Sequence, residues 1–218
     1  MIDLRTTIRT TGSVRSFTEE PVEPSLLHAV LDDARFAPSG GNRQPWRVAV
    51  VDDRHRRRQL ADLMRDVWEE YLGANASGVT AFAMGRSIDA PAVSAPNPLL
   101  DAIDAVPVVL AVAADLRKIS MMDGNLDRPP VTGGASIYPF CWNLLLSARA
   151  HGLGGVMTTF LSRSEPAAAL LLALPVDHAL VATIFLGHPV HQPTKLSRRP
   201  VSSFTTVDRF DGEPFGHD

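Results

Sequence analysis

Residues 37–46 read Ala37-Pro38-Ser39-Gly40-Gly41-Asn42-Arg43-Gln44-Pro45-Trp46 and separate a predicted helix from a predicted strand. Pro38 disfavours helical backbone at the residue before it, so the upstream helix should stop there. The glycines allow a ligand to approach the backbone closely, and the amide side chains of Asn42 and Gln44 can hydrogen-bond to the edge of a heterocycle. The stretch is therefore predicted to be a ligand-binding loop, although a Gly-Gly pair is more often only a turn.

The segments on both sides of this loop predict helices and strands in loose alternation. Upstream, Pro24 lies in the first turn of a helix with apolar residues at 26, 27, 30 and 31, which should run to Phe36. Downstream, Trp46–Val51 is rich in valine and alternates as a strand does, and Val106–Ala114 is a continuous apolar run typical of a buried strand. This alternation indicates an α/β or α+β fold around one sheet. Further helices are expected at 54–72, 79–87, 134–150 and 164–173, and further strands at 156–160 and 179–186.

Two of these segments have features of their own. Gly134–Ala150 is apolar on almost every face, which predicts a helix that is buried on every face. Asp115–Thr132 is a polar connection that contains glycine and proline, and it is long enough to be a binding loop or lid. If it closes over a ligand, Met121 and Met122 would offer an adaptable apolar wall. A mobile surface loop is the equal alternative.

The composition places the chain among ordinary globular proteins. It has 218 residues, of which 45% are hydrophobic and 21% are charged, so we expect a single domain over residues 1–218. The formal net charge of -3 gives no strong attraction to nucleic acid or to a membrane surface. The longest apolar run is too short to span a bilayer, and the N-terminus lacks the apolar segment of a secretory signal. We therefore expect a cytoplasmic protein with no nucleic-acid or membrane partner.

The cysteine and histidine content argues against a metal centre. Cys141 is the only cysteine, which excludes an intrachain disulfide and a multi-cysteine metal or iron–sulfur site, and its place in a helix predicts a buried packing role. His188 and His191 have no further ligand at a helpful spacing, so no metal is expected. The charged run Asp52–Arg58 is predicted to be a solvated helix start with exposed arginines.

Three segments are suited to an anionic, planar ligand. Ser13 and Arg15 present a hydroxyl and a guanidinium two residues apart, where both can bind a phosphate. The second segment is the loop Ser39–Gln44. At the third, Gly154-Gly155, the absence of side chains lets a flat ring lie against the backbone. Dinucleotide-binding, P-loop and nucleophile-elbow fingerprints are absent from the sequence, which leaves a Rossmann nucleotide site, a P-loop and a hydrolase without support.

In combination and in order, these segments resemble the nitroreductase family of FMN-dependent oxidoreductases. Ser13-Val14-Arg15-Ser16-Phe17 matches an S-[VI]-R-x-F element, and residues 37–46 are close to the element A-P-S-x-x-N-x-Q-P-W. The likeness covers residues 13–200. Its later parts are Gly134-Ala135-Ser136-Ile137, Asn143-Leu144-Leu145-Leu146, Gly152-Leu153-Gly154-Gly155, Leu186-Gly187-His188-Pro189 and Ser197-Arg198-Arg199-Pro200.

The resemblance implies an α+β fold with a central mixed or antiparallel sheet flanked by helices. It also implies an intertwined homodimer with two FMN sites at the subunit interface, each lined by both chains. Tyr138 and Trp142 would then be buried at the dimer contact.

The resemblance assigns the cofactor contacts to separate groups of residues. The FMN phosphate would be held by Ser13, Arg15 and Arg198 or Arg199. The N5/O4 edge of the flavin would lie beside Gly154 and Gly155. The ring and the ribityl chain would be contacted by Pro38, Ser39, Gly40, Asn42 and Gln44, contributed from the partner subunit.

The chain departs from the family pattern at two places around the expected phosphate site. The family usually has one or two basic residues just before the serine, where this chain has Thr11 and Gly12. Either a phosphate contact is lost, which would weaken FMN binding about tenfold or more, or Arg9 supplies it. The family also usually has a lysine two residues before the C-terminal arginine, where this chain has Leu196, with Lys195 adjacent.

By this resemblance the chain is expected to be an FMN-dependent reductase with NADH or NADPH as the reductant. Hydride would pass from NAD(P)H through flavin N5 to an electron-poor acceptor, such as a nitroaromatic or a quinone, by a ping-pong mechanism. No catalytic side chain is required, because the flavin performs the chemistry. One alternative is a flavin-binding or storage protein with little reductase activity. Another is a different reaction on the same fold, such as reductive removal of a halogen or attack on the flavin itself.

Overall fold

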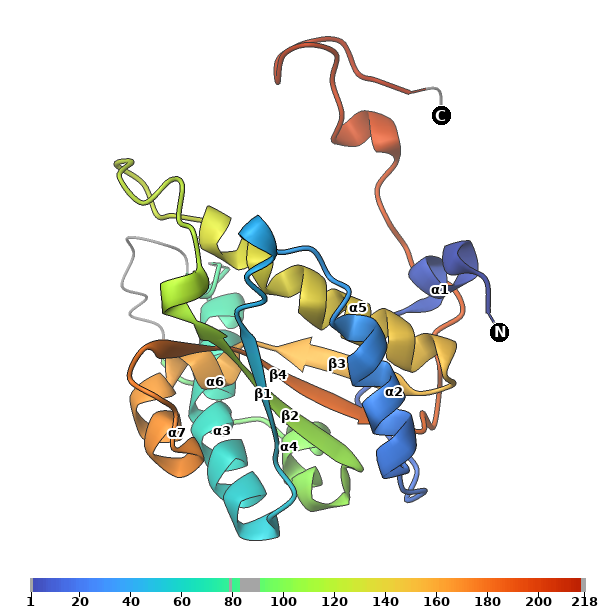
Figure 1. Cartoon of the computed structure of the whole chain (residues 1–218), viewed down its shortest axis with the longest axis vertical. Helices are drawn as coiled ribbons and strands as arrows, with labels where there is room; N and C mark the ends of the chain where they lie inside the picture. The colour runs from blue at the N-terminus through green and yellow to red at the C-terminus, as the bar shows by residue number, and fades with distance from the viewer. Residues whose placement is uncertain (1, 79, 83–90, 217–218) are drawn as a thin grey trace.

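The computed structural model describes residues 2–78, 80–82 and 91–216. Its centre is an antiparallel sheet in the order β1-β2-β4-β3, with helices on both faces (Figure 1). An α+β fold with an antiparallel sheet is therefore confirmed. The strands are β1 (Trp46–Val50), β2 (Val108–Asp115), β3 (Gly154–Thr158) and β4 (His178–Gly187).

Strand β2 explains why the core has two halves. Every residue of β2 is buried, as its continuous apolar run predicts. Because successive side chains of a strand point to opposite faces, Leu110 and Val112 enter one hydrophobic cluster while Val109 and Ala111 enter the other. The sheet is thus covered on both faces.

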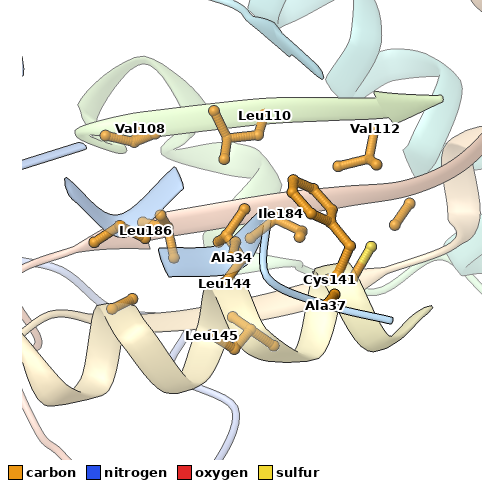
Figure 2. Packing of buried hydrophobic residues seen from close by; sticks show 14 of the residues in the cluster. Ala34, Ala37, Val108, Leu110, Val112, Cys141, Leu144, Leu145, Ile184 and Leu186 are labelled. Carbon is orange, nitrogen blue, oxygen red and sulfur yellow. The ribbon is translucent and has the colours of Figure 1, made fainter. Parts of the chain in front are cut away.

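The first face of the sheet is covered by α2 (Pro24–Ala34) and α5 (Tyr138–Ala150). Figure 2 shows the small residues Ala34 and Ala37 close to the side chains of the sheet and of α5. Cys141 is fully buried in this cluster, which confirms the packing role predicted for it. Burial raises the pKa of its thiol to about 12, so it stays protonated at neutral pH.

The second face is covered by four helices (Figure 1). Arg57 enters this layer and is 5% exposed, so the prediction that the arginines of the run Asp52–Arg58 are all solvated is wrong. Its guanidinium donates to the carbonyl oxygens of Val51 (2.6 Å) and Val106 (2.7 Å), which lie at the ends of neighbouring strands. Burial lowers the pKa of Arg57. The helices are α3 (Arg54–Ala76), α4 (Pro98–Asp101), α6 (Phe160–Arg163) and α7 (Glu165–Leu172).

Short elements complete the chain. The N-terminal helix α1 (Leu4–Thr10), which we did not predict, is capped by Asp3, whose carboxylate accepts a hydrogen bond from the Thr6 amide. The C-terminal segment after β4 passes α1 and then extends away from the sheet (Figure 1). Within the described residues, no helix has both the length and the apolarity needed to cross a membrane. Single 3-10 turns lie at Gly40–Asn42, Ile103–Ala105, Leu116–Lys118, Thr132–Ser136 and Val201–Ser203.

Several predicted boundaries are wrong by a few residues. The helix predicted from residue 134 begins at Tyr138, because the glycines before it form a 3-10 turn. The strand predicted at 156–160 lies at 154–158, since Gly154 and Gly155 pair with β4 and Phe160 begins α6. The helix predicted at 164–173 is confirmed as α7, but a separate turn, α6, precedes it. Most of the helix predicted at 79–87 lies outside the described residues.

The expectation that α5 is buried on every face is also wrong for this chain. Tyr138 is 41% exposed and Trp142 is 40% exposed, and side chains four residues apart share one face of a helix. Cys141 and Leu144, which lie on the side of the helix that packs on the sheet, are fully buried. The apolar composition of α5 therefore serves two surfaces, one of which faces outward.

Candidate functional site

The segment Ser13–Arg15 lies beside the edge strand β3. Ser13 forms an isolated parallel bridge with Gly155, and the Val14 amide donates to the Gly155 carbonyl oxygen at 2.9 Å. Val14 is 3% exposed, whereas the residues on either side of it point outward. This alternation fixes the Ser13 hydroxyl and the Arg15 guanidinium on the accessible side of the segment.

Gly154 and Gly155 are required for this arrangement. A Cβ atom at Gly154 would lie 2.8 Å from the Val14 side chain, and one at Gly155 would lie 2.5 Å from the Leu186 side chain and 2.8 Å from the carbonyl oxygen of Phe185. Close packing therefore accounts for both glycines. Their predicted place beside a flavin ring stays a prediction.

A cavity of 440 Å³ opens beside Arg15. Its walls are the C-terminal end of β3, the start of α4 and one side of α3. The aromatic members pack on one another: the ring centroids of Trp68 and Tyr71 are 5.8 Å apart, and that of Phe160 is 6.1 Å from each. The lining residues are Arg15, Trp68, Tyr71, Pro96–Leu100, Val156–Phe160 and Phe185.

A second cavity, of 390 Å³, adjoins the first. Both are lined by Arg15 and by Asn97–Leu99, so together they form one groove, which we call the Arg15 groove. The remaining lining residues of the second cavity are Ser13, Val14, Ser16, Val190, His191 and Pro193.

The Arg15 groove has a cationic end and an aromatic end. Within the described part of the chain, no carboxylate lies within ion-pair distance of the Arg15 guanidinium. At the other end, the indole nitrogen of Trp68 is buried and has no hydrogen-bond partner among the described residues. Ligand sites of this size are mostly apolar with a few placed polar groups. The arrangement suits a ligand with an anionic group at one end and a planar ring system at the other.

The C-terminal segment 188–196 runs along the N-terminal segment 10–18. The amides of Thr18 and Val190 donate to the carbonyl oxygens of His188 (2.8 Å) and Ser16 (3.1 Å), and the Gln192 side chain donates to the Thr10 carbonyl oxygen at 2.9 Å. These bonds fix the tail to the edge of the Arg15 groove.

The two departures from the family pattern meet at this contact. A Cβ atom at Gly12 would lie 2.9 Å from Leu196 and 3.1 Å from Pro193, so the tail occupies the space of a side chain at position 12. Arg198 donates to the carbonyl oxygen of its neighbour Ser197, and neither cavity of the groove is lined by Arg9, Arg198 or Arg199. A phosphate contact from Arg198 or Arg199 stays a prediction.

The loop Pro38–Gln44 lies elsewhere and is mostly exposed. Gly41, Asn42 and Gln44 have φ values of 60°, 52° and 47°, which are uncommon for residues other than glycine. The Ser39 hydroxyl accepts a hydrogen bond from the Gln44 amide at 3.0 Å, and the Gln44 side chain donates to the Asn42 side chain at 3.1 Å. Strained backbone of this kind clusters at ligand sites.

The loop is held in place by the connection between β2 and α5. The Gly40 amide donates to the Ser136 hydroxyl at 3.0 Å, and the Arg43 guanidinium donates to the Ser120 hydroxyl at 2.6 Å. Trp46, just after the loop, stacks on Phe140 with ring centroids 4.9 Å apart. The loop is therefore fixed to its own chain by these hydrogen bonds, while most of its residues remain exposed.

Two buried aspartates order the connection 115–132. Asp123 accepts hydrogen bonds from Arg128, from the Val131 amide, and from the amide and hydroxyl of Thr132, which lower the pKa of its carboxyl well below the usual range. Asp115 accepts hydrogen bonds from the Arg117 side chain, and its pKa is lowered to about 2. Met121 and Met122 are 49% and 85% exposed, and a lid role for this connection stays a prediction.

The structure thus brings some of the predicted site residues together and separates others. Ser13, Arg15, Gly154 and Gly155 share one edge of the sheet, whereas Pro38, Ser39, Gly40, Asn42 and Gln44 form a separate loop. Sequence analysis did not assign the remaining lining residues of the groove to the site, because they come from α3, α4, the end of β3 and the tail without a common motif. Val14 and Ser16 belong to the motif at residues 13–17, and His191 belongs to the histidine pair. The two histidine side chains contact different parts of the molecule. His188 Nε2 lies 3.6 Å from Glu20 Oε1, while His191 lines the groove.

Known proteins resemble this chain in sequence and in fold. A family profile described as "Nitroreductase family" matches residues 8–188. The 5,6-dimethylbenzimidazole synthase of Rhodospirillum rubrum is 31% identical over 195 residues, which cover 86% of this chain and 86% of the relative. The NADH dehydrogenase of Thermus thermophilus is 27% identical over 212 residues, which cover 92% of this chain and 94% of the relative. A crystal structure from Desulfovibrio desulfuricans, of a protein in complex with FMN, has a TM-score of 0.68 and 22% identity, with 99% of each chain covered.

Proposed function

Because this chain belongs to the nitroreductase family, we propose that it is an FMN-dependent oxidoreductase that uses NADH or NADPH to reduce an electron-poor small molecule. The observation that carries the proposal is the Arg15 groove, with its cationic end and its aromatic end. Nitroaromatics and quinones are the acceptor classes that we expect. The fold neighbours include a complex with FMN, which supports flavin use in this fold.

The residues of the groove fit FMN in character and in size. FMN joins a planar isoalloxazine to a phosphate, and the groove joins an aromatic cavity of 440 Å³ to a cavity of 390 Å³ that holds the exposed side chains of Ser13 and Arg15. Both volumes lie within the range usual for ligand sites, roughly 300–1,000 Å³. In the described part of the chain, neither cavity is lined by a carboxylate that would repel the phosphate.

In this proposal the protein binds FMN, orients it and excludes water from it. The Ser13 hydroxyl and the Arg15 guanidinium would hold the phosphate through charge-assisted hydrogen bonds. The aromatic wall of Trp68, Tyr71 and Phe160 would exclude water from one side of the ring. When bound, FMN supplies the hydride transfer between nicotinamide and acceptor.

We further propose that a second copy of the chain completes the site. Nitroreductase family members are commonly homodimers. The loop Pro38–Gln44 has strained backbone, is mostly exposed and lines neither cavity of the Arg15 groove in its own chain. Tyr138 and Trp142 form an exposed aromatic face on α5 that a second copy would cover. In such a dimer, the loop would reach the flavin ring of its partner.

A visible absorption spectrum under anaerobic conditions tests the proposal. Purified protein reconstituted with FMN should lose the oxidised flavin band when NADPH or NADH is added, and should then reduce a quinone. Bound flavin that stays oxidised with both nicotinamides would reject the reductase and favour a storage protein. The absence of any bound flavin would reject FMN dependence itself.

A second candidate function follows from the relatives that are synthases. The 31% identity to the synthase of Rhodospirillum rubrum supports, as an alternative to reduction of an added acceptor, synthesis of 5,6-dimethylbenzimidazole with the flavin itself under attack. Incubation of the protein with FMN, NADPH and oxygen, followed by chromatography, separates the two. Formation of 5,6-dimethylbenzimidazole would select the synthase, and rapid turnover of a quinone without it would select the reductase.

A further inference from the structure

We propose that His191 binds the FMN phosphate in its protonated form and replaces the basic residue that the family usually carries beside the serine. This inference rests on the proposed function, because it takes FMN as the ligand of the Arg15 groove. Its consequence is that the affinity for FMN depends on pH, through a residue of the C-terminal tail.

The places where the family carries its basic residues are closed in this chain. Gly12 has no side chain, and the tail residues Pro193 and Leu196 fill the space where one would lie. Thr11 is 8% exposed, and its hydroxyl donates to the Thr7 carbonyl oxygen at 2.7 Å, so it points into α1. Arg9 is exposed on α1 and lines neither cavity. A replacement cation therefore has to come from another segment.

The same tail that closes position 12 delivers His191 to the groove. The Val190 amide is bonded to Ser16, and the Gln192 side chain is bonded to Thr10, so His191 is fixed from both sides. His191 lines the 390 Å³ cavity together with Ser13, Arg15 and Ser16. An imidazolium, a guanidinium and hydroxyl groups are donors to phosphate oxygens.

The charges around His191 favour an anion. Among the described residues that line this cavity, the only other titratable one is Arg15, and the α4 side contributes Asn97, Pro98 and Leu99. On its own segment, His188 turns toward Glu20 at 3.6 Å, and Lys195 is exposed. Because no carboxylate is among the lining residues that the structure describes, a bound phosphate would be the counter-ion of His191.

The direction of the pH dependence follows from the two titrations. A phosphate monoester has its second pKa near 6, and histidine side chains lose their charge within the range of about pH 5–8. As the pH rises from about 6.5 to about 8.5, the phosphate gains only the last part of its second charge, while an imidazolium loses its proton. The affinity for FMN should therefore fall as the pH rises, by about tenfold, the usual size of one charge-assisted hydrogen bond.

Flavin fluorescence during titration with the apoprotein measures this affinity without any turnover. We expect the Kd for FMN to rise about tenfold across this range in the unchanged protein, and the Kd for riboflavin, which has no phosphate, to stay constant. His191→Gln should raise the Kd at low pH to the value found at high pH. His191→Arg should restore tight binding and remove the pH dependence, which also shows that the tail still folds.

His188→Gln is the matched control, because it removes a histidine three residues away that faces Glu20. It should keep the full pH dependence. A Kd for FMN that does not change with pH, an equal change for riboflavin, or a flat profile in His188→Gln would each overturn the inference and leave FMN binding intact. Failure to bind FMN at any pH would instead overturn the proposed function.

Discussion

The Ser13–Arg15 segment and the Pro38–Gln44 loop are both expected to contact one flavin, yet they are built differently. The first is paired with β3, requires Gly154 and Gly155 beside it, and faces a groove of its own chain. The second is strained and exposed, and it is tied to Ser120 and Ser136. One segment thus faces a groove of its own chain, whereas the other lines neither cavity of that groove and is proposed to contact a second copy.

The largest expected effect contrasts a glycine in each region. In Gly155→Ala the new Cβ would collide with Leu186 and with the backbone oxygen of Phe185, so the free energy of unfolding should fall by about 1–3 kcal/mol. In Gly40→Ala the nearest atom lies 3.6 Å away, so the change should stay within about 0.5 kcal/mol. Denaturant unfolding measures both. Equal losses would contradict the difference drawn between the two regions.

The next effect concerns charge at the groove. Arg15→Gln removes the guanidinium that is proposed to hold the phosphate, so the Kd for FMN should rise about tenfold or more while the Kd for riboflavin changes little. Arg43→Gln is the matched variant in the loop, and its effect should be smaller and similar for both flavins. Fluorescence titration measures the Kd of each variant for FMN and for riboflavin. A riboflavin defect as large as the FMN defect in Arg15→Gln would remove the phosphate assignment.

A smaller effect is expected at the support of the loop. The pKa of Asp123 is lowered by hydrogen bonds from Thr132 and Val131 in the folded protein, so its ionised form stabilises the fold above the unfolded-state pKa of about 3.9. This stabilisation is lost as the pH falls through the lower folded-state value. The midpoint of thermal unfolding of Asp123→Asn should therefore lie below that of the unchanged protein at pH 7, and the gap should narrow below about pH 4. A gap that does not change with pH would show that the charge is unimportant.

The smallest effect is expected in the core on which both regions rest. Cys141 is fully buried and the pKa of its thiol is raised to about 12, so a thiol reagent should leave the folded protein unlabelled at pH 8 and label it after denaturation. Mass spectrometry reads out the labelling. Rapid reaction in the folded state would mean that α5 does not pack on the sheet as described.

The parts of the fold that sequence analysis predicted are those with a strong local signal. Val106–Ala114 is apolar without a break, and it forms β2 at the centre of the sheet. Helix α3 has an apolar stripe, and the proline at the start of α2 suits a first turn. The ten-residue motif at 37–46 indicated the family, which the matching profile confirms.

The parts that could not be predicted depend on contacts between distant segments. Arg57 looks like one arginine of a solvated run, and its burial depends on carbonyl groups at the ends of two strands. The contact of Leu196 with Gly12 joins two residues 184 positions apart. In the sequence, each of them looks only like the loss of a basic residue that the family usually has there. The exposed face of α5 could not be predicted either, because the sequence of an apolar helix does not show which of its faces packs within the chain.

Mixed dimers test most directly the claim that the two regions meet across two chains. Arg15→Glu should abolish phosphate binding, and Gly40→Trp should block the loop that is proposed to reach the flavin of the partner, so dimers of either variant alone should bind no FMN. In a purified dimer of one chain of each variant, one site combines both defects and the other contains neither. The account predicts one bound FMN per mixed dimer, measured by flavin absorbance. No bound FMN in the mixed dimer would mean that each site lies within a single chain, and would contradict it.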